Sequence, residues 1–230
     1  MERSSLQIMR DTVHALLMRE IKTRFGNSKL GYFWALAEPA AQASIIAIIF
    51  TLLGRNSLAG VPVALFLISG VMAFKTFSKT LSQLSSGISA NKALFAYRQV
   101  SPIDPILTRL IIEVATFFIV YIILLSIMYW IGIDVWPQDL LALICASSLL
   151  ITLAVGIALC VNSALLYWQD TGKIINMIMM PMFMISGIFF CATMIPAKYW
   201  FLFTWNPIFH AIELSRDAFF ESYVTPVGDW

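Results

Sequence analysis

Two lysines in an apolar stretch are the residues of this chain most able to do chemistry. Lys75 and Lys79 are four residues apart, so a helix places both on one face. An ammonium group in an apolar setting snorkels to a polar surface, pairs with an acid, or faces water. Two interpretations stay open at this point: the lysines snorkel, or they form a positive lining for an anionic substrate.

Catalytic chemistry has no comparable candidates. The sequence has no Walker A loop, no nucleophile–base pair and no metal-ligand cluster. His210 and Glu213 lie one helical turn apart, with no further ligand near them in the sequence. Glu213, Asp217 and Glu221 are interpreted as the solvated face of a helix rather than as paired catalytic acids. We therefore expect no catalytic residue, metal site or cofactor in this chain.

Composition indicates which solvent surrounds these residues. Of 230 residues, 60% are hydrophobic and 12% are charged, whereas soluble domains carry about 25% charged residues. The bilayer is therefore the expected environment, and a net charge of +2 is too small to indicate a nucleic-acid partner. Three widely spaced cysteines predict no structural disulfide.

Residues 1–31 predict an amphipathic helix that lies in the membrane interface. Apolar residues recur at helical spacing from position 6 to position 25, with most charged residues off that stripe. The cations that this interpretation places near lipid headgroups are Arg19, Lys22, Arg24 and Lys29. An aromatic cluster, Tyr32 to Trp34, follows as an interfacial belt. The alternative is a soluble helix packed on a partner.

Five apolar stretches predict membrane spans, at 34–54, 61–84, 106–133, 140–166 and 174–190. Glu38 is expected near the start of the first span, where the helix dipole favours a carboxylate. The second is uncharged only over residues 61–74, or roughly 21 Å of helix against a hydrocarbon core of about 30 Å. Lys75 and Lys79 therefore belong to its last third. In the third span, Arg109 and Glu113 are spaced to pair.

Two connecting segments have distinct compositions. Residues 91–105 form a polar, aromatic-rich loop with room for one short helix before Pro102. This loop is either a docking surface for a soluble partner or an ordinary basic juxtamembrane loop. Residues 192–225 are too short and too charged to span. Here Asn206 and Pro207 predict a helix start, and the segment is expected to form one or two helices at the outer face.

The distribution of basic residues predicts the orientation. With the N-terminus inside, ten lysines and arginines fall in inner segments and three in outer ones, leaving aside the two lysines of the second span. This bias predicts a cytoplasmic N-terminus. The ten are Arg3, Arg10, Arg19, Lys22, Arg24, Lys29, Lys92, Arg98, Arg109 and Lys173, and the three are Arg55, Lys198 and Arg216.

Several motifs, in order, resemble one family. Residues 19–26 (REIKTRFG) and 30–39 (LGYFWALAEP) are similar to the entry of ABC export permeases for polysaccharides. Residues 91–98 (NKALFAYR), followed by Pro-Ile-Asp at 102–104, narrow the resemblance to capsular polysaccharide export permeases of the KpsM type. Short motifs within residues 195–216 (IP, YW, WNP and ELSR) extend this resemblance to the segment expected at the outer face. The resemblance covers essentially the whole chain, as a single permease domain over residues 1–230.

The resemblance implies a function and a set of partners. Such permeases are homodimers with two cytoplasmic ATP-binding subunits, which hold ATP and Mg²⁺, and export lipid-linked anionic polysaccharide across the bacterial inner membrane. They cooperate with a periplasmic co-polymerase-type protein and an outer-membrane export protein. The family also has a sixth span after the periplasmic helices, which is expected beyond residue 230.

The resemblance also assigns roles to particular residues. Those that match the ATPase-coupling helix are Asn91, Lys92, Leu94, Phe95, Tyr97 and Arg98. Those expected along the substrate path, where carboxylates or phosphates of the glycan would be met, are Lys75, Lys79, Ser82, Tyr32 and Trp34.

Three other functions are alternatives to a capsular polysaccharide export permease. An ion-coupled secondary transporter would require an unpaired intramembrane acid or broken helices in two related halves, and neither is found. A membrane-embedded glycosyl enzyme would require paired carboxylates in one pocket. An ABC exporter of another glycan, O-antigen or teichoic acid, stays open as an alternative.

Overall fold

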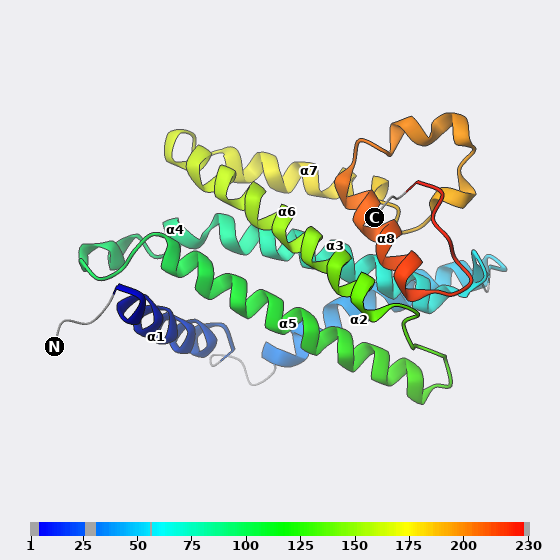
Figure 1. The fold of residues 1–230 in the computed structure, drawn as a ribbon, viewed down its shortest axis with the longest axis horizontal. Helices are drawn as coiled ribbons and strands as arrows, with labels where there is room; N and C mark the ends of the chain where they lie inside the picture. The colour runs from blue at the N-terminus through cyan, green and yellow to red at the C-terminus, as the bar shows by residue number, and fades with distance from the viewer. Residues whose placement is uncertain (1–4, 26–30, 56, 228–230) are drawn as a thin grey trace.

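A computed structural model describes residues 5–25, 31–55 and 57–227, without the side chains of residues 5, 6, 24, 25, 31, 32, 35 and 36. The described chain is a helical bundle (Figure 1). Its α-helices are α1 (Ser5–Phe25), α2 (Gly31–Leu52), α3 (Val63–Ser85), α4 (Gly87–Ala90), α5 (Ile103–Trp130), α6 (Leu140–Tyr167), α7 (Thr171–Ile185) and α8 (Pro207–Phe219). Short 3₁₀ helices are η1 (Lys92–Ala96), η2 (Ala192–Met194) and η3 (Ala197–Leu202).

Three of these helices, α3, α5 and α6, are long and apolar enough to cross a membrane, judged by length and composition over the described residues. The 28 residues of α5 and of α6 give a length of about 42 Å, more than a hydrocarbon core of about 30 Å. The other two apolar helices are shorter: Ala37–Leu52 within α2, and α7. The helical membrane fold is therefore confirmed, and the count of five spans stays a prediction.

The centre of the bundle is α3, which packs against α2, α5, α6 and α8. Its apolar side chains are buried around the whole helix; Leu67, Val71, Phe77, Leu81 and Leu84 are all at most 2% exposed. A helix that is apolar all round must be surrounded by other elements. In α6 the contact face is built partly from alanines, which let the helix axes approach closely.

The connection from α2 to α3 is a minimal hairpin. Strands β1 (Ser57–Leu58) and β2 (Val61–Pro62) pair antiparallel. Ala59 and Gly60, between them, have φ values of 50° and 81°, as tight two-residue hairpins require. The predicted short return between the first two spans is thus confirmed.

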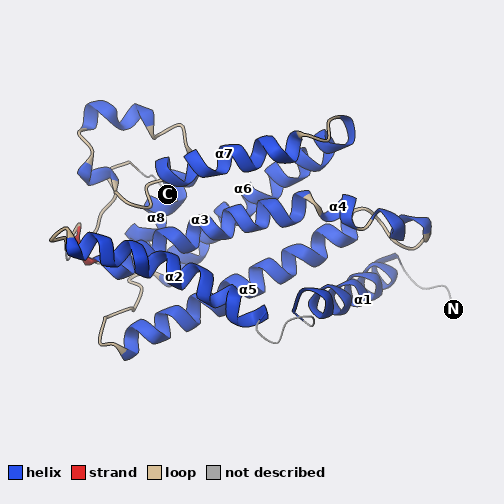
Figure 2. Cartoon of the chain, turned by 180° about the vertical axis from the view of Figure 1, so that it is seen from behind, coloured by secondary structure: helices blue, strands red, loops and turns tan. Residues whose placement is uncertain are grey.

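The connections fall at two opposite ends of the bundle (Figures 1 and 2). One end holds α1, α4, η1 and the turn between α6 and α7, and α1 lies beside α5. The other end holds the hairpin, η2, η3 and α8. The segments that were predicted to be inner therefore share one end, and those predicted to be outer share the other.

The C-terminal helix corrects a prediction. Its start is as expected, since the Asn206 side chain accepts a hydrogen bond from the backbone N–H of Ile208 at 3.0 Å and Pro207 is the first helical residue. The expected solvated face, however, is wrong for Glu213, which is 0% exposed, while Glu221 is exposed. The cause is that α8 packs against both α3 and α6, so that both of its faces are covered.

Candidate functional site

A three-residue ionic cluster joins α2 to α3. The carboxylate of Glu38 accepts a hydrogen bond from Lys75 Nζ at Oε1 and one from Lys79 Nζ at Oε2, the latter at 3.1 Å. The side chains become more exposed outward, from 18% at Lys75 to 42% at Lys79 and 54% at Glu38. One carboxylate thus serves two ammonium groups, and each oxygen takes one.

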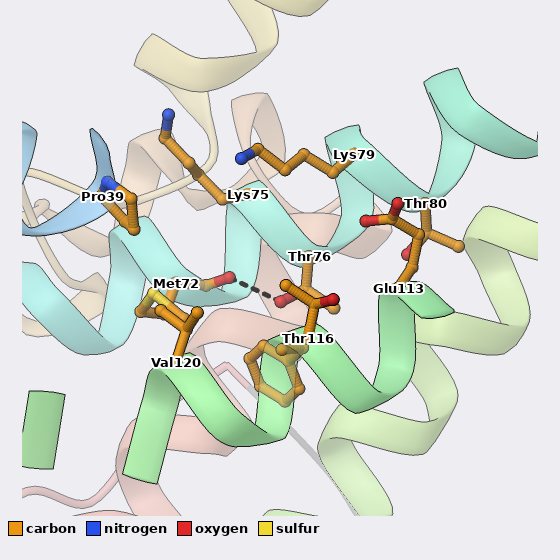
Figure 3. Close-up of a pocket in the computed structure, with 10 residues that line it drawn as sticks. Pro39, Met72, Lys75, Thr76, Lys79, Thr80, Glu113, Thr116 and Val120 are labelled. Carbon is orange, nitrogen blue, oxygen red and sulfur yellow. Dashed lines mark hydrogen bonds between the residues drawn. The ribbon is translucent and has the colours of Figure 1, made fainter. Parts of the chain in front are cut away.

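Beside this cluster lies a cleft between α3 and α5, closed on one side by Pro39 (Figure 3). Its empty volume is about 370 Å³, part of which is open to the surroundings. The two lysines extend to the same side of α3, while Glu113 and Thr116 approach from α5. The lining residues are Pro39, Met72, Lys75, Thr76, Lys79, Thr80, Glu113, Thr116, Phe117 and Val120.

The polar side chains of this cleft are set by helical spacing. Helical spacing places four polar side chains on the side of α3 that faces α2 and α5. They are Lys75, Thr76, Lys79 and Thr80. Thr76 Oγ1 donates to the Met72 carbonyl at 2.8 Å. The hydroxyl is thereby satisfied within its own helix, and its oxygen keeps acceptor capacity.

The position of Glu38 corrects a second expectation. The helix α2 begins at Gly31, so Glu38 lies about two turns inside it rather than at its start. The helix dipole therefore does not stabilise the charge of this carboxylate; its two lysine partners on α3 do. Sequence spacing could not indicate the contact of Glu38 with the two lysines, because Glu38 is separated from Lys75 by 37 residues and from Lys79 by 41.

The arrangement has the charge and the hydrogen-bond donors that suit an anion. Two neighbouring lysines, of which Lys79 is the more exposed, attract carboxylate or phosphate groups by charge and hydrogen bonding. Ser82 and Trp34, also predicted along the path, are exposed but do not line the cleft. The side chain of Tyr32 lies outside the described residues. Across the described part of the chain, no three His, Cys, Asp or Glu residues are grouped so as to hold a metal ion.

The 91–98 segment protrudes at the end of the bundle that holds α1 (Figures 1 and 2). It forms the short helix η1, as predicted. Lys92, Tyr97 and Arg98 are exposed, with Tyr97 at 66%. Leu94 and Phe95 are half-buried.

Asn91 points inward instead. It is 3% exposed, and its amide donates to the Gly87 carbonyl at 2.8 Å. Its carbonyl oxygen accepts a hydrogen bond from Arg19 of α1. Arg19, which the sequence places near headgroups, therefore also contacts the base of the 91–98 segment.

A second contact ties α1 to the bundle. Arg109, for which the spacing predicted Glu113 as partner, donates from Nε to Glu20 of α1 at 3.1 Å. Its Nη1 donates to the Gln83 carbonyl and to Ser86 Oγ, both at 2.7 Å. Of the other predicted headgroup cations, Lys22 is exposed. Lys29 and the side chain of Arg24 lie outside the described residues.

An ionic group at the opposite end is fully buried. Arg216 is 0% exposed, and its guanidinium donates to the carbonyls of Gly187, Ile188 and Phe190 at 2.6 to 3.1 Å. Its Nη1 lies 3.5 Å from Glu213 Oε1. Burial lowers the pKa of Arg216 to about 10, and the neighbouring Glu213 opposes that shift. The guanidinium therefore stays charged at neutral pH and holds the chain after α7 against α8.

The three cysteines differ in their exposure. Cys145, Cys160 and Cys191 are all unbridged. Cys191 is buried, whereas Cys145 and Cys160 face outward from α6, although cysteines within an apolar run are more often buried. In an apolar helix such positions are compatible with lipid as the surrounding solvent.

The fold and the site together define a helical integral membrane protein with a cluster of charged residues between its helices. Comparison with known proteins then gives the family. The ABC-2 type transporter profile matches residues 12–220. Over 225 residues the chain is 36% identical to the polysialic acid transport protein KpsM of Escherichia coli, covering 98% of this chain and 87% of KpsM.

Two further relatives agree. The capsule polysaccharide export inner-membrane protein CtrC of Neisseria meningitidis serogroup B is 30% identical over 96% of this chain and 83% of its own length. The corresponding protein BexB of Haemophilus influenzae is 28% identical over 95% of this chain and 82% of its own length. The chain belongs to the ABC-2 type transporter family, among its capsule polysaccharide export permeases.

Proposed function

We propose that this chain is the membrane subunit of an ATP-driven exporter that moves lipid-linked anionic capsular polysaccharide across the bacterial inner membrane. The observation that carries the choice of an anionic cargo is the lysine pair of α3, which lines the cleft between α3 and α5. Carboxylates or phosphates along a glycan complement such a pair. Membership of a capsule export family supports the same substrate class.

The energy source is proposed to be two separate ATP-binding subunits, which hold ATP and Mg²⁺ and dock on the 91–98 segment. Its exposed basic and aromatic side chains, Lys92, Tyr97 and Arg98, have the composition of a docking surface. The segment follows α3 and α4 directly and precedes α5, so force applied to it reaches both walls of the cleft. Rigid helices are the elements suited to carry such a displacement.

The assembly is proposed to follow the family. The chain forms a homodimer with its N-terminus in the cytoplasm, and five helices of this chain, α2, α3, α5, α6 and α7, cross the membrane. The segment 192–225 then lies on the periplasmic side, where a co-polymerase-type protein and an outer-membrane export protein receive the glycan. Clustering of α1, η1 and the turn between α6 and α7 at one end supports this orientation.

Two variants of the complete complex test the proposal. Lys75→Glu places an acid where the glycan would meet a cation, so capsule at the cell surface should fall at least tenfold with assembly unchanged. Tyr97→Ala on the docking surface should lower glycan-stimulated ATP hydrolysis and leave the lysine cleft intact. Lys198→Glu, on η3 at the opposite end, is the matched charge-reversal control. Normal export by Lys75→Glu would remove the lysine from the path.

A further inference from the structure

The lysine pair of α3 is already occupied by a carboxylate of the same chain. Glu38 brings each of its oxygens to one lysine, in the bidentate way that an external carboxylate would use. Of the acids at this site Glu38 is the accessible one, because its side chain is 54% exposed, while Glu113 across the cleft is 7% exposed. Lys75 and Lys79 thus form an anion-binding site that is filled by the Glu38 carboxylate of the same chain.

The exposure of the three side chains allows exchange. Lys79 and Glu38 are open to an approaching anion, whereas Lys75 is mostly covered. An incoming carboxylate can therefore contact Lys79 first and reach Lys75 as Glu38 withdraws. Because the Lys79 and Glu38 side chains are 42% and 54% exposed, this exchange of partners requires no unfolding of either helix.

The helix that carries Glu38 packs on α3 along one face and leaves the opposite face exposed. Among the described residues of α2, only Pro39 and Ala43 are buried. Pro39 lacks an N–H, so the helix loses a backbone hydrogen bond immediately after Glu38, which weakens α2 at this point. The outer face of α2 is apolar and exposed. The two lysine contacts of Glu38 are polar links between α2 and α3.

We propose that Glu38 is a displaceable counter-ion: anionic groups of the glycan take its place on Lys75 and Lys79, and its release loosens α2 from α3. This inference rests on the proposed function, since it assumes an anionic cargo at the lysine pair. It adds a specificity device. A neutral glycan cannot displace Glu38, so the closed contact between α2 and α3 persists in its presence.

Binding to the solubilised complex with its ATPase tests the inference, with dye-labelled trigalacturonate as the acidic probe and equally labelled maltotriose as the neutral one. Removing the resident anion with Glu38→Gln should tighten trigalacturonate binding about threefold to tenfold, because the probe no longer competes with it. Glu221→Gln, which neutralises an exposed acid at the other end, should leave the affinity unchanged. Maltotriose should respond to neither variant.

The double variant Lys75→Gln/Lys79→Gln separates the two claims. If it binds trigalacturonate as the wild type does, the anionic path itself is wrong. If it binds more weakly while Glu38→Gln binds no tighter than the wild type, the path stands and the counter-ion role is overturned. A gain in Glu38→Gln that extends equally to maltotriose also overturns it. Should Glu38→Gln not assemble, Glu38→Asp, whose carboxylate is one methylene shorter, should tighten binding about twofold, and unchanged binding would overturn the role.

Discussion

The close approach of α3 to the buried arginine makes Gly70 the sharpest test of the packing. A Cβ atom added to Gly70 would lie 2.7 Å from Arg216 Nη2 and 3.2 Å from Ile188 Cα. Helix α3 is fixed on all sides, so it cannot retreat. Gly70→Ala therefore pushes the guanidinium away from the carbonyls of Gly187 and Ile188, or displaces the chain that carries them.

The expected magnitude follows from the contacts that are lost. A hydrogen bond to a charged group contributes about 1.5–3 kcal/mol, and overpacking a well-filled core costs about 1–3 kcal/mol. Replacing Gly by Ala inside a helix recovers roughly 0.5–1 kcal/mol of backbone entropy. Because either the guanidinium or the packing gives way, one of these two losses applies, and the net loss should be about 1–2 kcal/mol, or roughly 2–8 °C in melting temperature for a chain of this size.

Thermal unfolding of the purified complex, followed by tryptophan fluorescence, measures the effect. The matched control is Gly156→Ala in α6, because the Cβ it adds would meet nothing within 4 Å. This control should keep or slightly raise the melting temperature. If Gly70→Ala and Gly156→Ala melt at the same temperature, the close packing of Arg216 against Gly70 is refuted. A lower melting temperature in Gly156→Ala alone would refute it as well.

Two other contacts give predictions of known sign. Glu20→Ala removes the carboxylate that Arg109 contacts; the two side chains are only 13% and 9% exposed, so the loss in stability in thermal unfolding should be about 1–2 kcal/mol. The control is Asp170→Asn, which weakens an exposed ion pair with Lys173 and should cost under about 0.5 kcal/mol. Similar losses in both would contradict the burial argument. Asn206→Ala deletes the cap that accepts from the N–H of Ile208 and should cost about 1 kcal/mol by the same measurement, and Asn206→Asp should retain most of the stability.

Local patterns account for what could be predicted from the sequence. The N-terminal helix, the five apolar helices, the short hairpin and the cap at Asn206 each depend on residues within a few positions of one another. Periodicity and capping report such features directly. The family was likewise visible in short ordered motifs, including NKALFAYR at 91–98.

Partners distant in the chain could not be predicted in this way. The sequence marks Lys75 as a charge within an apolar stretch, but nothing near it in the chain indicates Glu38 as the acid that it contacts. Arg109 had a plausible local partner one turn away, and its contact with Glu20 comes from a residue 89 positions earlier. Spacing finds acids on the same helix and gives no information about acids on other helices.

The sequence by itself determined that this chain is a helical membrane protein, which of its stretches form helices, and which of its residues carry charge within apolar stretches. Only the tertiary structure decided which helix faces are covered: α8, amphipathic in pattern, is buried on both faces, and Glu213 with it. The physical reason is that helix formation is set within a few turns. The environment of a side chain, in contrast, depends on which other helices pack against it.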